Sequence, residues 1–257
     1  MLAIISPAKT LDFTSLLHTD KHSIPEFTKE SIELITRLRK LTPADISSLM
    51  GISDKLANLN FDRYAQWQPD FINNDARPAV LAFKGDVYQG LDAQSLATRD
   101  LSWAQKHVRV LSGLHGLLRP MDLIHPYRLE MGTRLKTSKG NNLYDFWANK
   151  VTDSINTGLA EQRSKVLINL ASNEYYKVID PANVDGRILT INFKEWRRDA
   201  YRFVSFSAKK ARGLMVRYMI DTRATSPNQL KNFAVEGYSF NAELSSEDDW
   251  MFTRTPQ

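Results

Sequence analysis

The chain has 257 residues, of which 42% are hydrophobic and 25% charged, and it contains no cysteine. These values are typical of a soluble globular protein that can bury a substantial core, and they exclude disulfides, thiolate nucleophiles and cysteine-ligated metals. No apolar run approaches the ~20 residues that would span a bilayer, so no membrane partner is expected.

The first predicted strand lies in residues 1–5, an apolar run with no basic residue before it. Such a start is typical of a buried strand and not of a signal peptide, so a cytoplasmic location is expected. The strand is followed by Ser6, Pro7 and Lys9, which places a cation at its carboxyl edge. A helix with one apolar stripe is then predicted from about Pro25 to Lys40.

Two further helices are predicted within residues 42–59. Thr42 and Pro43 form a typical helix start, and the second helix begins near Lys55, after a break that contains Gly51 and Ser53. The pattern is similar to a helix-hairpin-helix, whose hairpin N–H groups bind one DNA phosphate without reading the sequence. Ser53 stands where that motif has a second glycine, and an ordinary pair of helices is the alternative.

The middle of the chain reads as two strands separated by helical residues. A strand is predicted at Ala79–Phe83 and is followed by Lys84, and another is predicted at 108–111 after helical residues at about 92–107. Gly113 and Gly116 follow the second strand, with fixed charges just beyond them at Arg119, Arg128 and Glu130. The glycine pair suits an anion-binding loop, and a tight strand-to-helix turn is the alternative.

The second half alternates helices and strands in the same way. A helix is predicted at 143–161, and strands are predicted at 134–136, 165–170, 183–192, 201–206, 233–240 and 250–252. A last helix is predicted after Ser207, with Lys209, Lys210 and Arg212 in its first turns. Cations are unfavourable at the positive end of a helix, so an anion bound nearby would relieve the repulsion.

Positive charge is concentrated in two segments. Residues 187–223 contain ten Lys/Arg against three acidic residues, and residues 99–139 contain eight against three, whereas the chain from Glu236 onward is acidic. This distribution indicates a surface that binds a polyanion, although a solvated charged face would look the same. The mixed order of elements predicts one α+β (mixed α/β) domain over residues 1–257. It would have a central mixed sheet, surrounding helices and a helical subdomain at 25–60, with the helix-hairpin-helix at about 43–59.

Six segments carry a resemblance to a known family: LAIISPAKTLDF (2–13), LTPADISSLMGISDKLA (41–57), FKGDVYQGL (83–91), LSGLHGLLRPMDLIHPYRLEMG (111–132), INLASNEYYK (168–177) and SFSAKKARGLMVRYMI (205–220). Together they closely resemble the bacterial YaaA family of peroxide-stress resistance proteins. The resemblance implies a protein that limits free iron and oxidative damage to DNA, with a helix-hairpin-helix and a basic cleft for duplex or distorted DNA. It implies Gly51, Ser53 and Lys55 as the hairpin contacts and transfers no catalytic residue.

The leading hypothesis is therefore sequence-tolerant binding of double-stranded or structurally distorted DNA, with no cofactor, no metal and no obligate protein partner. The expected cleft residues are Lys9, Lys84, Arg119, Arg128, Lys209, Lys210 and Arg212. An alternative is a DNA-repair or nucleotide-processing enzyme of the lyase or glycosylase kind. It would form a Schiff base through Lys9 or Lys209, with Asp86, Glu130 or Glu174 as acid–base partners.

Direct binding of iron is a third hypothesis, which would need histidine and carboxylate ligands. His107, His115 and His125 show no metal-ligand spacing, and an effect on iron is expected to be indirect.

Overall fold

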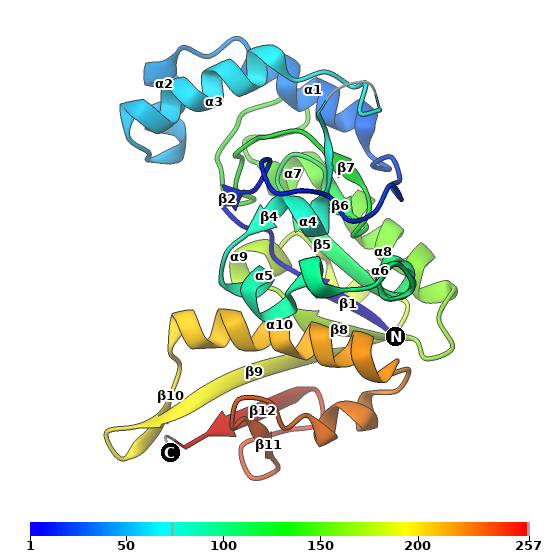
Figure 1. Cartoon of the computed structure of the whole chain (residues 1–257). Helices are drawn as coiled ribbons and strands as arrows, with labels where there is room; N and C mark the ends of the chain where they lie inside the picture. Colours follow the sequence, from blue (N-terminus) through cyan, green and yellow to red (C-terminus); the bar gives the residue numbers. More distant parts are fainter. Residues whose placement is uncertain (73–74, 256–257) are drawn as a thin grey trace.

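The computed structural model describes residues 1–72 and 75–255 of the chain. Its centre is a mixed β-sheet with helices packed around it (Figure 1). The strands lie in the order β11 (Ser239–Asn241), β12 (Asp249–Arg254), β9 (Arg187–Arg197), β8 (Val166–Leu170), β1 (Leu2–Ile5), β5 (Val108–Ser112) and β6 (Gly116–Leu118), and β10 (Ala200–Arg202) pairs with the end of β9.

The middle of the sheet is parallel. β1 pairs in parallel with both β5 and β8, β8 pairs in parallel with β9, and β9 with β12. The sequence explains this arrangement, because β1 is a continuous apolar run, β8 is apolar except at Asn169, and all their residues are buried. Strands that are covered on both faces lose the alternation of polar and apolar residues.

Ten α-helices surround the sheet in the described residues: α1 (Thr28–Leu38), α2 (Pro43–Met50), α3 (Asp54–Gln66), α4 (Ala79–Ala82), α5 (Asp86–Leu91), α6 (Thr98–His107), α7 (Leu143–Trp147), α8 (Lys150–Ala160), α9 (Asn173–Tyr176) and α10 (Ser205–Thr222). Short 3₁₀ turns lie at Ala93–Ser95, Pro181–Asn183 and Pro227–Asn232. Figure 1 shows α1, α2 and α3 at one end of the molecule and β9, β11 and β12 at the other. This architecture confirms the predicted mixed α/β class.

Two small antiparallel pairs complete the fold, β2 (Thr10–Leu11) with β4 (Phe83–Lys84) and β3 (Arg77–Pro78) with β7 (Leu123–Ile124). The β2–β4 pair holds the segment after β1 beside the segment before α5. None of the helices in residues 1–72 and 75–255 combines the length and the apolar content that crossing a bilayer requires.

Several expected elements are different in the structure. The strand predicted at Ala79–Phe83 is wrong, because these residues form the buried helix α4 and only Phe83 begins a strand. A short apolar run satisfies a buried helical turn as well as a buried strand, and periodicity does not separate the two. The strand predicted at 134–136 is absent, and the helix predicted at 143–161 is divided into α7 and α8 at Ala148, whose φ is +40°.

The glycine loop after β5 is also different from the prediction. Residues 112–116 turn back into β6 as a β-hairpin and are buried, so this turn does not lead into a helix. A Cβ on Gly113 would lie 2.2 Å from the Leu129 carbonyl oxygen, and a Cβ on Gly116 would lie 2.7 Å from the Trp147 ring. Both glycines are therefore required for close packing, and the anion-binding interpretation of this pair is wrong.

Candidate functional site

The order of the parallel strands reverses between β1 and β8. The chain passes from β1 to β5 on one side, then crosses to β8 on the other side of β1 and continues to β9. In open α/β sheets, ligands bind in the crevice outside the carboxyl ends of the strands at such a point. Ser6 follows β1 and Ser172 precedes α9 after β8, and the Ser172 N–H donates to Ser6 Oγ at 2.9 Å. The two strand ends are thus joined at the reversal.

A cleft of about 480 Å³ opens at this place. It is lined by the segment after β1, the β4–α5 segment, α9 and the first half of α10. Its polar lining includes four cations, Lys9, Lys84, Lys209 and Arg212, against two carboxylates, Asp86 and Glu174. Four of the seven basic residues predicted for a cleft therefore line one cavity.

The two N-terminal lysines of the cleft form weak ion pairs. Lys9 Nζ lies 3.1 Å from Glu130 Oε1, and Lys84 Nζ lies 3.9 Å from Asp12 Oδ2. The Lys9 and Lys84 side chains are 66% and 64% exposed. Because exposed ion pairs contribute about 0–1 kcal/mol, both ammonium groups remain available to an anionic ligand.

The two cations that α10 contributes to the cleft have no acidic partner in residues 1–72 and 75–255. No carboxylate in the described part of the chain lies within ion-pair distance of Lys209 or Arg212. Arg212 Nε is buried and has no hydrogen-bond partner there. Burial lowers the pKa of Arg212, yet a guanidinium stays protonated in proteins. Arg212 is therefore a partly desolvated charge that only a bound anion would neutralise.

Two glycines place α10 against the cleft. A Cβ on Gly213 would lie 1.8 Å from the Val87 carbonyl oxygen, and a Cβ on Gly90 would lie 2.1 Å from the Lys210 carbonyl oxygen. Helices α5 and α10 thus cross backbone to backbone, which only glycine permits at both positions. This contact sets Arg212, one residue before the crossing, beside the β4–α5 wall of the cleft.

The other three predicted basic residues lie elsewhere. Arg128 donates from Nε and Nη2 to Glu130 Oε1, the oxygen that also contacts Lys9, so Arg128 adjoins the cleft through a shared carboxylate. Arg119 Nη2 lies 2.9 Å from Asp122 Oδ1, and Lys210 Nζ lies 2.5 Å from Glu236 Oε1. Arg119 and Lys210 do not line the cleft.

The α2–α3 turn is short and open. Thr42 caps α2 by accepting from the Asp45 N–H, and Asp45 completes a capping box. Gly51 ends α2 with φ +59°, where an added Cβ would have no neighbour within 4 Å. Ser53 is extended (φ −63°, ψ 155°) and precedes α3. Serine at this position therefore carries no left-handed strain, and the turn needs only one glycine.

The candidate catalytic lysine Lys9 is exposed and ion-paired, unlike the desolvated surroundings that activate a lysine nucleophile. Of its proposed partners, Asp86 and Glu174 line the same cleft, and Glu174 Oε1 accepts from the Gly132 N–H at 3.0 Å. The geometry brings these groups together without singling out an acid–base pair.

The three histidines considered for iron lie among aromatic residues. His107 stacks on Trp103 at 4.1 Å between ring centroids, and His125 stacks on Phe71 at 5.1 Å. Burial lowers the pKa of His115 to about 3, so its ring is neutral at physiological pH. In residues 1–72 and 75–255, no three histidine or carboxylate side chains are placed to hold a metal ion.

Some lining residues were not identified from the sequence as parts of a site. Tyr88 and Tyr175 are buried rings in the wall, and the Tyr88 hydroxyl donates to the Ser6 carbonyl oxygen at 3.2 Å. The available signal was their position, since each lies two to five residues after a lysine or serine at a strand end. Aromatic residues next to such polar residues are as common in cores as in sites.

Comparison with known proteins covers nearly the whole chain. The sequence profile described as peroxide stress protein YaaA matches residues 1–244. A UPF0246 protein of Janthinobacterium sp. (strain Marseille) is 52% identical over 254 residues, which cover 99% of this chain and 98% of that protein. A UPF0246 protein of Paraburkholderia phytofirmans is 50% identical over 256 residues, which cover 99% of this chain and 98% of that protein. The cleft and the α2–α3 turn both fall within the matched residues.

Proposed function

The chain belongs to the peroxide stress protein YaaA family, and from this premise we propose that it protects cells against peroxide by binding DNA through the cleft and the α2–α3 turn. The binding is sequence-tolerant, and its partner is double-stranded or structurally distorted DNA. Its consequence in the cell is less oxidative damage to DNA, in association with a low level of free iron.

The observation that carries this proposal is the set of unpaired cations in the cleft. Lys209 and Arg212 have no acidic partner in the described residues, and the exposed Lys9 and Lys84 lie at the same opening. The phosphates of a nucleic acid supply the anions that these groups lack. Each phosphate contact releases counterions, so binding weakens as salt rises, with a slope of about −0.9 per contact on logarithmic axes.

The α2–α3 turn supports a second contact with the backbone. The first N–H groups of a helix have no partner within the helix, and Ser53 provides no side-chain cap for α3. We assign the turn as a helix-hairpin-helix in which Gly51 makes the bend and Ser53 and Lys55, both exposed, face a phosphate. In Figure 1 the α2–α3 pair lies at the upper end, and α5, α9 and the start of α10 lie below it on the same side.

The test is binding of a fluorescent duplex over a salt series, with two matched pairs of variants. Lys209→Glu is expected to weaken binding at least tenfold at low salt and to lower the salt slope, because it reverses an unpaired charge. Lys210→Glu is the control on the same helix and should have less effect, because Lys210 is engaged with Glu236. An equal loss of affinity in the two variants would show that binding depends on the net charge of the protein and not on the cleft.

The turn is tested by Ser53→Pro against Ser53→Ala. Proline fits the observed φ of −63° and removes both the N–H and the hydroxyl, whereas alanine removes only the hydroxyl, so the difference between the two variants reports the N–H. Weaker binding by the proline variant alone is expected. No binding of the wild-type protein at low salt would refute the proposed function.

A further inference from the structure

The cleft at the β1–β8 reversal is much smaller than a duplex. Its volume of about 480 Å³ is within the range of small-molecule sites, about 300–1,000 Å³. A cube of that volume has an edge of about 8 Å, whereas the major groove of B-DNA alone is about 12 Å wide. A double helix can lie across the opening, but only a small group can enter.

The charges of the cleft change with depth. Lys9 and Lys84 are two-thirds exposed and lie at the rim, while Arg212 Nε is buried. A guanidinium binds phosphate through two parallel hydrogen bonds, and here none of its donors is engaged by the described residues. Arg212 is less exposed than the three lysines that line the cleft, so it is the least hydrated anion-binding group of the site.

The remaining lining suits the uncharged part of such a ligand. The rings of Tyr88 and Tyr175 and the side chain of Val87 give the cleft an apolar wall. Ser6 and Ser172 add hydroxyl groups at the ends of β1 and β8. An apolar wall with a few polar groups and one anchored charge is the usual composition of a site that orients a small ligand.

We propose that this cleft holds one nucleotide, with its phosphate on Arg212 and Lys209 and its ring system against Tyr88 and Tyr175. The nucleotide is either a free mononucleotide or an unpaired nucleotide extruded from a DNA strand whose neighbouring phosphates contact Lys9 and Lys84. The second source rests on the proposed function. Extrusion is easiest for a base that is already unpaired, which would favour bulged or damaged DNA.

The first arm of the test is calorimetric titration with deoxyadenosine monophosphate and, separately, with inorganic phosphate. The mononucleotide should bind more tightly than phosphate, because the apolar wall adds contacts. Arg212→Gln should weaken its binding at least tenfold. Lys209→Gln, at an exposed position that cannot unfold the protein, should weaken it severalfold, and Lys210→Gln should leave it unchanged.

The second arm uses a duplex that carries 2-aminopurine either fully paired or in a one-nucleotide bulge. Tighter binding of the bulge, with a rise in fluorescence as the base leaves the stack, identifies the extruded source. Mononucleotide binding without preference for the bulge identifies the free source, and either result supports the proposal.

Two outcomes would overturn it. One is the absence of both mononucleotide binding and bulge preference, and the other is binding that Arg212→Gln and Lys209→Gln leave unchanged. If duplex binding persists in that case, the cleft proposal is lost and the DNA-binding function stands. If duplex binding is absent but the mononucleotide binds, the DNA-binding function is lost and the cleft is a nucleotide site.

Discussion

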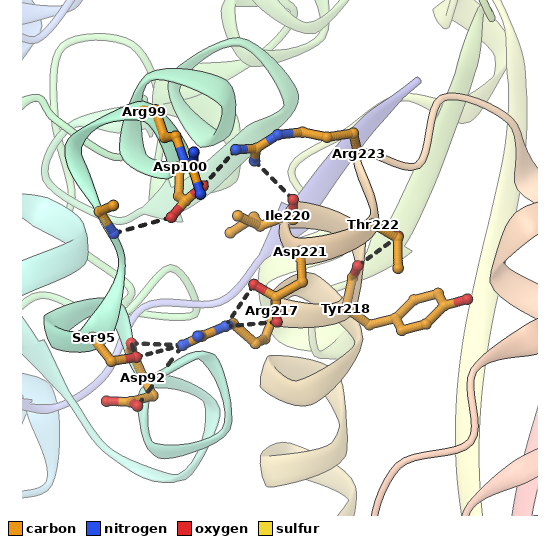
Figure 2. A network of polar contacts seen from close by, with 11 residues as sticks. Asp92, Ser95, Arg99, Asp100, Arg217, Tyr218, Ile220, Asp221, Thr222 and Arg223 are labelled. Atoms are coloured by element: carbon orange, nitrogen blue, oxygen red, sulfur yellow. Dashed lines mark hydrogen bonds and ion pairs between the residues drawn. The ribbon is translucent and has the colours of Figure 1, made fainter.

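The two halves of α10 carry the same kind of charge in opposite circumstances. In the first half, Lys209 and Arg212 line the cleft and have no acidic partner among the described residues, whereas Lys210 pairs with Glu236 outside the cleft. In the second half, Arg217 is engaged, and so is Arg223, the residue that follows the helix (Figure 2). Arg217 Nε donates to both carboxylate oxygens of Asp221, at 3.0 and 2.9 Å, and Arg223 pairs with Asp100 and donates to the Ile220 carbonyl oxygen.

Other partners of Arg217 come from a distant part of the chain. Arg217 Nη1 also donates to the Asp92 carbonyl oxygen and to Ser95 Oγ, which belong to the segment between α5 and α6 (Figure 2). The arginines at this end therefore fasten α10 to the α5–α6 segment. A segment rich in arginine and lysine thus contains structural ion pairs as well as the unpaired cations of the proposed binding surface.

The largest expected effect comes from substituting Gly213, the residue at which α10 crosses α5. Gly213→Ala would place a Cβ 1.8 Å from the Val87 carbonyl oxygen and force α10 away from α5. We expect a loss of about 3 kcal/mol in the free energy of unfolding, the upper part of the usual range for overpacking. Urea denaturation measures it, with the exposed Thr222→Ala as a control that should change stability by less than about 0.5 kcal/mol. Similar stabilities would mean that the helices do not cross so closely.

A smaller loss is expected at the paired end. Arg223→Ala removes the contacts with Asp100 and the Ile220 carbonyl oxygen, and should cost about 1 kcal/mol because the pair is partly exposed. Arg223→Gly removes the same contacts, but glycine favours the observed φ of +52° by about 1 kcal/mol. The glycine variant should therefore be close to wild type in stability. DNA affinity should be unchanged in both, and a clear loss of affinity would contradict the division of α10.

The smallest effect has the opposite sign. Arg212→Gln removes a desolvated charge that has no partner, so the free energy of unfolding should stay the same or rise by up to about 1 kcal/mol. The same thermal or urea measurement that detects the loss in Arg223→Ala would detect this difference. A marked destabilisation would show that Arg212 has a structural partner, and the two halves would then be alike.

Local patterns predicted much of the fold. Strands were predicted at 1–5, 108–111 and 165–170 because these largely apolar runs are followed by polar residues, and the structure confirms them as β1, β5 and β8. Residues 79–83 have the same composition and form a helical turn. Which of the two structures forms depends on the residues that pack around the run. Neither the length of the run nor its periodicity predicts those neighbours.

The candidate site was predictable only in part. Lys9 follows a predicted strand that the structure confirms, so its place at the edge of the sheet could be expected. Lys84 reaches the same edge through the β2–β4 pair, because the strand predicted before it is a helix. Arg119 and Lys210 could not be told from Lys209, although Asp122 lies only three residues after Arg119. The partner of Lys210 lies 26 residues away, in Glu236. That Arg212 has no partner among the described residues depends on the positions of all their acidic side chains, and only the folded chain shows it.

The position of β1 has a consequence for how the protein is made. This strand is synthesised before the other strands of its sheet, yet it lies in the middle of the sheet. It pairs on one side with β5, from residue 108, and on the other with β8, from residue 166. At about 5–20 residues per second, the ribosome takes roughly 10–30 s to supply both neighbours. During that time the apolar strand β1 lacks at least one of its two neighbouring strands. The nascent chain is therefore exposed to aggregation, and both edges of β1 are paired only after Leu170 has been translated.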